Sequence, residues 1–317
     1  MMHRLLRYAG VAALVVGLNF LLPRWLPGSP VAGGDQTAAL PAAARQILTE
    51  TYHLDDPLWR QFTRYLADLA HGDLGWSMTS HRAVRLVLAE RLPWTLSLVG
   101  GAVLVAAVFG AAVGWRAATH PKGNGTRVLT SAVFGIGALP EFLLGMLLIV
   151  GLASRLHVFP PGGGQTLFID DAGVLQRLID LAWHAVLPGL TLVLIIAPAF
   201  ALLVRNATAP VLGAPFLTAA RARGLPAQRV AWHVWRNALP PVVTLLGLRL
   251  GAAVAGAAVV ERLFAYPGMG WLLFEAVSTR DYPLLQGIVL VSSLAVLTMN
   301  FALDAIGAWL DPRTAPS

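Results

Sequence analysis

Residues 93–115 form an unbroken run without a charged side chain. A helix of this length, rising 1.5 Å per residue, crosses the hydrocarbon core of a bilayer, which is about 30 Å thick. The whole chain has the same character, because 56% of its 317 residues are hydrophobic and only 12% are charged. Soluble domains carry about 25% charged residues. The sequence therefore predicts an all-α membrane protein.

Five further apolar segments bring the predicted number of transmembrane helices to six. They are residues 8–22, 128–152, 184–204, 242–260 and 284–303. Pro140 and Glu141 interrupt the third helix of the six. The first helix resembles a secretory signal peptide, since Arg4 and Arg7 precede its apolar run. Because no small-residue cleavage site precedes Pro23, we expect it to be retained as a span.

Basic residues indicate how the six helices are oriented. The loops between helices two and three and between helices four and five hold Arg116, Lys122, Arg127, Arg205, Arg221, Arg223, Arg229 and Arg236. The arginines of the opposite loops are balanced by acidic residues. Since positively charged loops stay in the cytoplasm, both termini are predicted to be cytoplasmic. The net charge of +7 has the same origin, so no nucleic-acid partner is expected.

The chain divides into three predicted regions. Residues 1–30 hold the N-terminal transmembrane helix. Residues 31–92 are much more polar and are predicted to form a small extracytoplasmic region, with a short helix over 41–52 and a second helix over 56–69, where apolar residues have helical spacing. Residues 93–313 hold helices two to six and a polar loop over 206–241.

Several classes of function lack the residues that they need. The chain has no cysteine, which excludes disulfides and cysteine-based metal sites. The histidines and acidic residues of region 31–92 lack the spacing of metal ligands. Gly28, Gly33 and Gly34 are not followed by the Lys-Ser/Thr pair of a phosphate-binding loop, so the chain is not expected to bind ATP. No hydrolase motif occurs, and we expect no catalytic, cofactor or metal site.

The loop 206–241 is the most distinctive polar segment of the chain. Its alanines favour a helix, Gly224 is a C-terminal stop signal, and a second helical run over 226–238 follows. Small side chains let a partner approach closely, and arginines donate paired hydrogen bonds to carboxylates. We therefore interpret the segment as a docking element. Its predicted contact residues are Thr218, Ala219, Ala220, Arg221, Ala222, Arg223, Gly224 and Arg229.

The same residues resemble the coupling loop of permease subunits in ATP-binding-cassette (ABC) importers. Residues 218–224, followed by Arg236-Asn237-Ala238-Leu239-Pro240, are similar to the form of this loop in the dipeptide/oligopeptide permease family. The general importer signature has Glu at the position of Thr218, and the peptide branch departs from it in the same way as this chain. The resemblance extends from the first span to Arg313 and implies a type I ABC importer-like permease fold.

A second motif follows the fifth predicted helix. Glu261, Phe264, Pro267, Gly268 and Gly270 fit the family's Glu-x-x-Phe-x-x-Pro-Gly-x-Gly string. The glycines supply turn geometry, so the residues themselves predict an ordered outer turn. The resemblance implies that this turn is a re-entrant segment near the pathway exit, facing the binding protein.

Glu141 and Arg249 are charged side chains within predicted spans. Such groups are costly in lipid and usually face a partner or a water-filled path. Two interpretations stay open. The two side chains form an intramembrane pair, or one of them lines the translocation path; the alternative to both is a buried pair with a purely structural role.

The resemblance implies a permease subunit that forms the pathway for peptides or a similar small solute by alternating access. It implies as partners a second homologous permease subunit, two ATPase subunits that bind ATP and Mg, and an extracytoplasmic solute-binding protein. The chain itself is then not an enzyme, and it lies in the cytoplasmic (inner) membrane of a bacterium. The cargo stays open among peptides, nickel, glutathione, opines and sugars. The alternative is a secondary transporter or channel subunit without an ATPase, although such carriers often show internal repeats and none is evident here.

Overall fold

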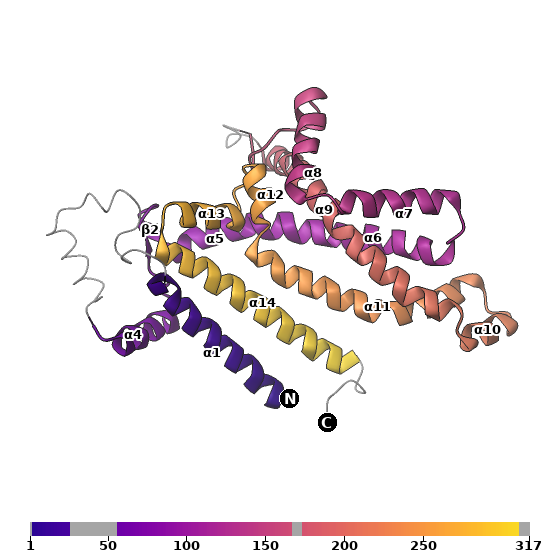
Figure 1. Ribbon diagram of the computed structural model, residues 1–317, viewed down its shortest axis with the longest axis horizontal. Helices are drawn as coiled ribbons and strands as arrows, with labels where there is room; N and C mark the ends of the chain where they lie inside the picture. Colours follow the sequence, from indigo (N-terminus) through magenta and orange to yellow (C-terminus); the bar gives the residue numbers. More distant parts are fainter. Residues whose placement is uncertain (1, 26–55, 167–172, 311–317) are drawn as a thin grey trace.

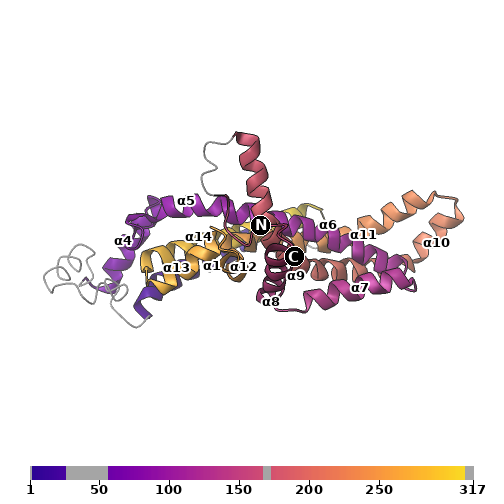
Figure 2. The same ribbon diagram turned by 90° about the horizontal axis from the view of Figure 1, so that it is seen from above.

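The computed structural model describes residues 2–25, 56–166 and 173–310. The predicted short helix over 41–52 lies outside these residues, as does most of the N-terminal half of region 31–92. The described chain is almost entirely helical, and its long helices lie side by side in a flat arrangement (Figures 1 and 2). The first turns of α9 project from this layer (Figure 2).

The helices and strands follow one another with short connections. In chain order the described helices are α1 (Met2–Trp25), α4 (Leu58–Ala70), α5 (Val84–Thr95), α6 (Gly101–Thr119), α7 (Asn124–Gly137), α8 (Glu141–Leu148), α9 (Val174–Leu212), α10 (Pro215–Ala222), α11 (Ala227–Ala252), α12 (Ala258–Leu263), α13 (Met269–Ser278) and α14 (Tyr282–Leu310). The π-helical turn Leu96–Gly100 joins α5 to α6, and a second, Ile149–Arg155, continues α8. The short strands β1 (Trp76–Ser77) and β2 (Arg82–Ala83) pair antiparallel.

Four helical segments are long and apolar enough to cross a membrane. They are Val84–Thr119, Val174–Leu212, Ala227–Ala255 and Tyr282–Ala302. A fifth candidate is the pair Asn124–Gly137 and Glu141–Arg155, which is bent by 107° at the predicted interruption. The all-α prediction is thus confirmed, with four or five candidate spans among the described residues, and the full count of six stays a prediction.

The helix ends differ from the predicted ones. Packing extends the helices past the polar residues and prolines from which their ends were predicted. The second predicted span begins at Val84 rather than at 93, since Val84, Val87 and Leu88 pack with residues of α13 and α14 in one buried cluster. Pro93 lies inside this helix. Helix α9 likewise runs on to Leu212, so α10 and its flanking turns occupy only residues 213–226 of the predicted loop 206–241.

Helix α11 crosses the predicted break at Pro240 and Pro241 without interruption. Its buried residues Val234, Ala238 and Val242 continue one face past the two prolines. The predicted fifth span over 242–260 ends early, because Gly256 turns the chain with a φ of +81°. Residues 258–260 already belong to α12.

The centre of the molecule is the contact between α6 and α9. A Cβ atom at Gly110 would lie 2.4 Å from the carbonyl oxygen of Ala197, and one at Gly114 would lie 2.3 Å from the carbonyl oxygen of Ala201. Glycines at this four-residue spacing let two helix backbones approach closely, as in membrane helix pairs. Phe200 and Val204 of α9 are buried beside them.

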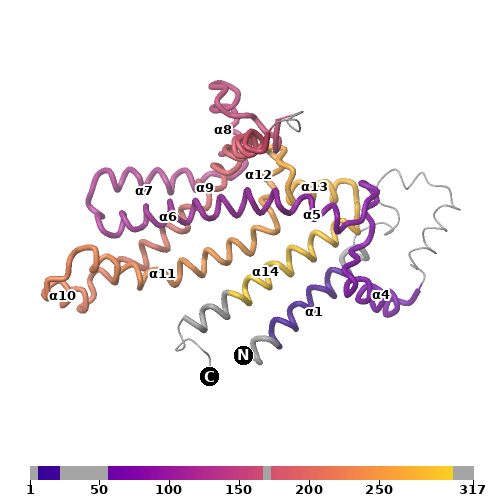
Figure 3. The backbone as a smooth tube through the Cα atoms, turned by 180° about the vertical axis from the view of Figure 1, so that it is seen from behind, coloured from indigo at the N-terminus to yellow at the C-terminus, as the bar shows by residue number. Residues whose placement is uncertain are grey.

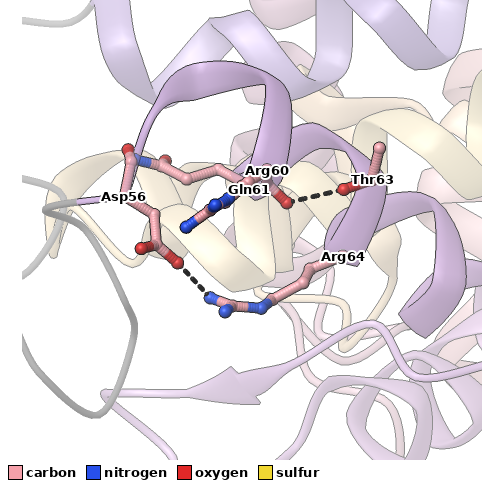
Figure 4. A network of polar contacts seen from close by, with 5 residues as sticks. All are labelled: Asp56, Arg60, Gln61, Thr63 and Arg64. Carbon is pink, nitrogen blue, oxygen red and sulfur yellow. Dashed lines mark hydrogen bonds and ion pairs between the residues drawn. The ribbon is translucent and has the colours of Figure 1, made fainter.

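Helix α4 covers the end of α1 that lies opposite α10 (Figures 1 and 3). The rings of Phe62 and Tyr65 lie 5.1 and 5.7 Å from the ring of Phe20. At the start of α4, Asp56 pairs with Arg64 at 2.6 Å (Figure 4). The helix predicted over 56–69 from its apolar spacing is therefore confirmed.

Replacing Gly114 by Ala is expected to lower the thermal unfolding midpoint of the purified protein in detergent. The new methyl group overlaps a backbone carbonyl that cannot rotate away, and overpacking of this kind costs about 1–3 kcal/mol. The matched control is Gly101→Ala on the same helix, where no atom lies within 4 Å of the added carbon. Equal midpoints for the two variants would show that the α6–α9 contact is looser than described.

Candidate functional site

The loop helix α10 lies at one end of the molecule, between α9 and α11 (Figure 1). Pro215 occupies its first turn, where a missing N–H is harmless. Leu217 is fully buried and forms a hydrophobic cluster with Val230 and Val234 of α11. Leu225 packs against the same cluster. The apolar side of α10 therefore fixes the helix on the start of α11.

The end of α10 is a Schellman motif centred on Gly224. The N–H of Leu225 donates to the carbonyl of Ala220 at 3.2 Å, and the N–H of Gly224 donates to the carbonyl of Arg221 at 2.9 Å. Gly224 has a φ of +74°, a conformation that glycine adopts without strain. The predicted stop signal at Gly224 is confirmed, and it makes the end of α10 a defined turn.

The other side of α10 is an exposed surface of small and basic residues, which we call the α10 face. Its exposed members are Thr218, Ala219, Arg221, Ala222, Arg223, Gly224 and Arg229, and Ala220 is half-buried. In the described part of the chain, no carboxylate forms an ion pair with Arg221, Arg223 or Arg229. The predicted docking residues thus lie together, with their guanidinium groups available to another molecule.

The outer turn is built around the fully buried carboxylate of Glu261 in α12. The backbone N–H groups of Gly270 and Trp271 donate to Glu261 Oε2 at 2.7 and 3.1 Å. The hydroxyl of Thr95, at the end of α5, donates to Glu261 Oε1 at 3.0 Å. The same hydroxyl oxygen accepts the N–H of Met269 at 2.6 Å.

These hydrogen bonds satisfy the start of α13, which begins at Met269. The first N–H groups of a helix have no partner within the helix, and the positive end of the helix dipole favours an anion there. Glu261 supplies both the acceptor atoms and the negative charge. A buried carboxylate that has no cationic partner among the described residues is thereby stabilised, and α5, α12 and α13 are held at one point.

The glycines of the motif are required by this close packing. A Cβ atom at Gly268 would lie 2.3 Å from Glu261 Oε2, and one at Gly270 would lie 2.5 Å from the Cα atom of Ala258. Pro267 accepts a hydrogen bond on its carbonyl from Arg91 at 3.4 Å. The ordered turn predicted from Glu261, Pro267, Gly268 and Gly270 is therefore present as a structure, and its role in transport stays a prediction.

Sequence reasoning missed two residues of this turn. Thr95 lies at the start of the predicted second span, in the string Glu90-Arg91-Leu92-Pro93-x-Thr95-Leu96, which resembles the peptide permease family but does not predict a partner for the hydroxyl. Gly256 adopts a φ of +81°, and a Cβ atom there would lie 2.8 Å from the nitrogen of Gly270. Nothing in its local sequence distinguishes it from the other small residues of that stretch.

Two more buried polar contacts hold the same end together. Asp281 precedes α14 and accepts hydrogen bonds from the hydroxyl of Ser77 at 2.6 Å and the N–H of Thr79 at 3.0 Å. In α1, the amide of Asn19 donates to the hydroxyl of Tyr65 at 2.9 Å, and Gln286 donates to the carbonyl of Asn19 at 2.8 Å. These contacts tie the β-hairpin, α1 and α4 to α14.

Glu141 and Arg249 are not joined in this structure. Glu141 is half-buried at the start of α8, directly after the bend at Pro140, and a carboxylate is favourable at a helix N-terminus. Arg249 is exposed on α11. No ion pair links these two described residues. A role for either side chain in the pathway stays a prediction.

Comparison with known proteins decides the class of the chain. Residues 96–316 match the family described as "Binding-protein-dependent transport system inner membrane component". The chain belongs to this family. It is 36% identical to the glutathione transport system permease protein GsiC of Salmonella paratyphi A over 317 residues, which cover 98% of this chain and 97% of that protein. GsiC of Escherichia coli K12 is also 36% identical, over 98% of this chain and 96% of that protein.

A solved structure supports the fold of this inner membrane component. An inward-facing conformation of the MetNI methionine ABC transporter matches with a TM-score of 0.54 and 19% identity, over 72% of this chain and 97% of the matched chain. The resemblance to the peptide permeases of ABC importers is therefore confirmed, and the chain is a transport permease rather than an enzyme. The alternative of a secondary transporter or channel subunit is set aside by the family membership.

The variant Glu261→Gln is expected to lower the free energy of unfolding of this permease by about 1–3 kcal/mol, because the amide nitrogen of glutamine cannot accept a hydrogen bond and leaves a buried donor unpaired. Thermal unfolding in detergent measures the loss. The matched control is Glu275→Gln in α13, since the carboxylate of Glu275 makes no hydrogen bond to the described residues. A Glu261→Gln protein as stable as the control would contradict the role given to this carboxylate.

Proposed function

We propose that this permease is the transmembrane subunit of an ABC importer and that the α10 face is the docking site of an ATPase subunit. The observation that carries the proposal is the two-sided character of α10. Leu217 fixes one side on α11, while the other side offers small residues and exposed arginines that form no ion pair with the described residues. A partner with carboxylates on its surface fits this face by charge and by close approach.

The proposed mechanism needs only rigid-body motion from this chain. Two ATPase subunits bind ATP and Mg, and their closure draws the coupling helices of two permease subunits together. A short helix with a buried anchor and a defined end transmits such a displacement better than a flexible loop. This displacement switches the pathway between a conformation open to the outer side and one open to the cytoplasm. This switching is alternating access.

We propose six spans, with α1 as the first and the bent pair of α7 and α8 as the third. The basic residues of the loops support a cytoplasmic position of both termini and of α10. Similarity to GsiC supports the inner membrane of a bacterium as the location. Residues 31–83 are then extracytoplasmic, because the second span begins at Val84. This arrangement is supported by the position of α4 and the β-hairpin at the end of the molecule opposite α10 (Figures 1 and 3).

The remaining partners follow from the class of transporter. A second homologous permease subunit completes the pathway, and a solute-binding protein delivers the cargo to the outer side, where the Glu261 turn lies. Similarity to GsiC, a glutathione transport permease, supports a small peptide-like cargo. Glutathione is the first solute to test.

A pull-down of the tagged chain from its native membrane, followed by mass spectrometry, tests the proposal. The wild type is expected to recover an ATPase and a second permease. The variant Arg221→Glu/Arg223→Glu is expected to lose the ATPase and keep the second permease, because the charge of the α10 face is inverted. The matched control is Arg85→Glu/Arg280→Glu, which makes the same change in charge at exposed positions of the opposite end.

Each contrary outcome has a distinct meaning. If the wild type is recovered alone, the importer proposal is wrong. If the ATPase remains bound to the Arg221→Glu/Arg223→Glu variant as it does to the wild type, the importer stands and the docking site lies elsewhere.

A further inference from the structure

Two tryptophans stack between α6 and α11 near α10. The ring centroids of Trp115 and Trp235 lie 4.8 Å apart, and the ring planes differ by only 10°. Both side chains are half-buried. Trp232, one turn earlier on α11, is 61% exposed. Of these two tryptophans of α11, Trp235 is therefore the one that stacks on Trp115.

Trp115 connects two hydrophobic clusters. One is the helix core that contains Val103 and Phe200, and the other is the cluster of Leu217, Val230 and Val234 beneath α10. Trp115 packs against both, and within the described residues no other half-buried side chain does so. It lies where the anchor of α10 meets the transmembrane core.

The backbone beneath Trp115 is held firmly. The adjacent Gly114 lies in close contact with α9, since a Cβ atom there would lie 2.3 Å from the carbonyl oxygen of Ala201. Close-packed interiors transmit strain because they have little room to deform. A force applied to the ring of Trp115 is therefore passed to α6 and α9 together.

The backbone of α11 offers a weaker route. Pro240 and Pro241 lie inside this helix and have no N–H to donate to the carbonyls of Arg236 and Asn237. Two successive helical hydrogen bonds are missing between the start of α11, which carries the anchor of α10, and its apolar part. When α10 is displaced, α11 can bend at Pro240 and Pro241, and the displacement is then not transmitted along α11 to its apolar part.

We propose that the stack of Trp115 and Trp235 is the contact through which α10 moves the transmembrane core. Trp235 lies before the two prolines, on the segment that carries α10, and passes the displacement sideways to α6. Both tryptophans are positioning residues for the coupling of ATP hydrolysis to transport. The inference rests on the proposed docking of an ATPase at the α10 face.

Amide hydrogen exchange of the purified complex, with and without ATP and vanadate, tests this inference without knowledge of the cargo. In the wild type, exchange is expected to change in residues 215–226 and in residues 111–119. In Trp235→Ala, the change in 215–226 is expected to persist and the change in 111–119 to be reduced, because Trp115 then keeps only its own contact with the cluster beneath α10. Trp235→Phe, which keeps an aromatic ring, is expected to restore the full change in 111–119.

Trp232→Ala is the matched control, since it removes a tryptophan of the same helix without touching the stack. It is expected to behave like the wild type. An undiminished change in residues 111–119 of Trp235→Ala overturns the inference. So does a wild type in which residues 215–226 respond and residues 111–119 do not. A complex without an ATPase, or one in which residues 215–226 do not respond, overturns the proposed docking as well.

Discussion

The carboxylate of Glu261 is the interaction on which the end of this permease opposite α10 depends. It is buried without an ion pair to any described residue, and it accepts hydrogen bonds from the N-terminus of α13 and from the hydroxyl of Thr95. The arrangement leaves no room for side chains at Gly268 and Gly270. One acidic residue therefore fixes three helices, and the positions of Gly268 and Gly270 follow from the space around that carboxylate.

The opposite end is organised differently. There α10 is attached by Leu217 and Leu225 through apolar contacts, while its arginines remain without partners in the described structure. Buried hydrogen bonds therefore hold one end of the molecule, and an apolar anchor holds the other. The close contact of α6 and α9 at Gly114 joins the two ends.

Sequence patterns predicted the helices and turns that are determined by residues close to one another in the chain. The long apolar runs are helices, the spacing of Phe62 and Tyr65 gave α4, and Gly224 ends α10. Features that depend on contacts between distant segments were not predictable. Helix α5 starts at Val84 because of its packing with α13 and α14, and α11 passes Pro240 because one buried face continues across it. The positions of Glu141 and Arg249 along their helices likewise did not reveal which way their side chains point.

Site-specific photo-crosslinking in the native membrane tests the central claim, that α10 receives an ATPase, most directly. A photoreactive residue at Ala222 on the α10 face is compared with one at Phe274, an exposed position on α13 at the other end. The account predicts a covalent adduct with an ATP-binding subunit from Ala222 and none from Phe274. Absence of that adduct at Ala222, or an equal yield from Phe274, would contradict it.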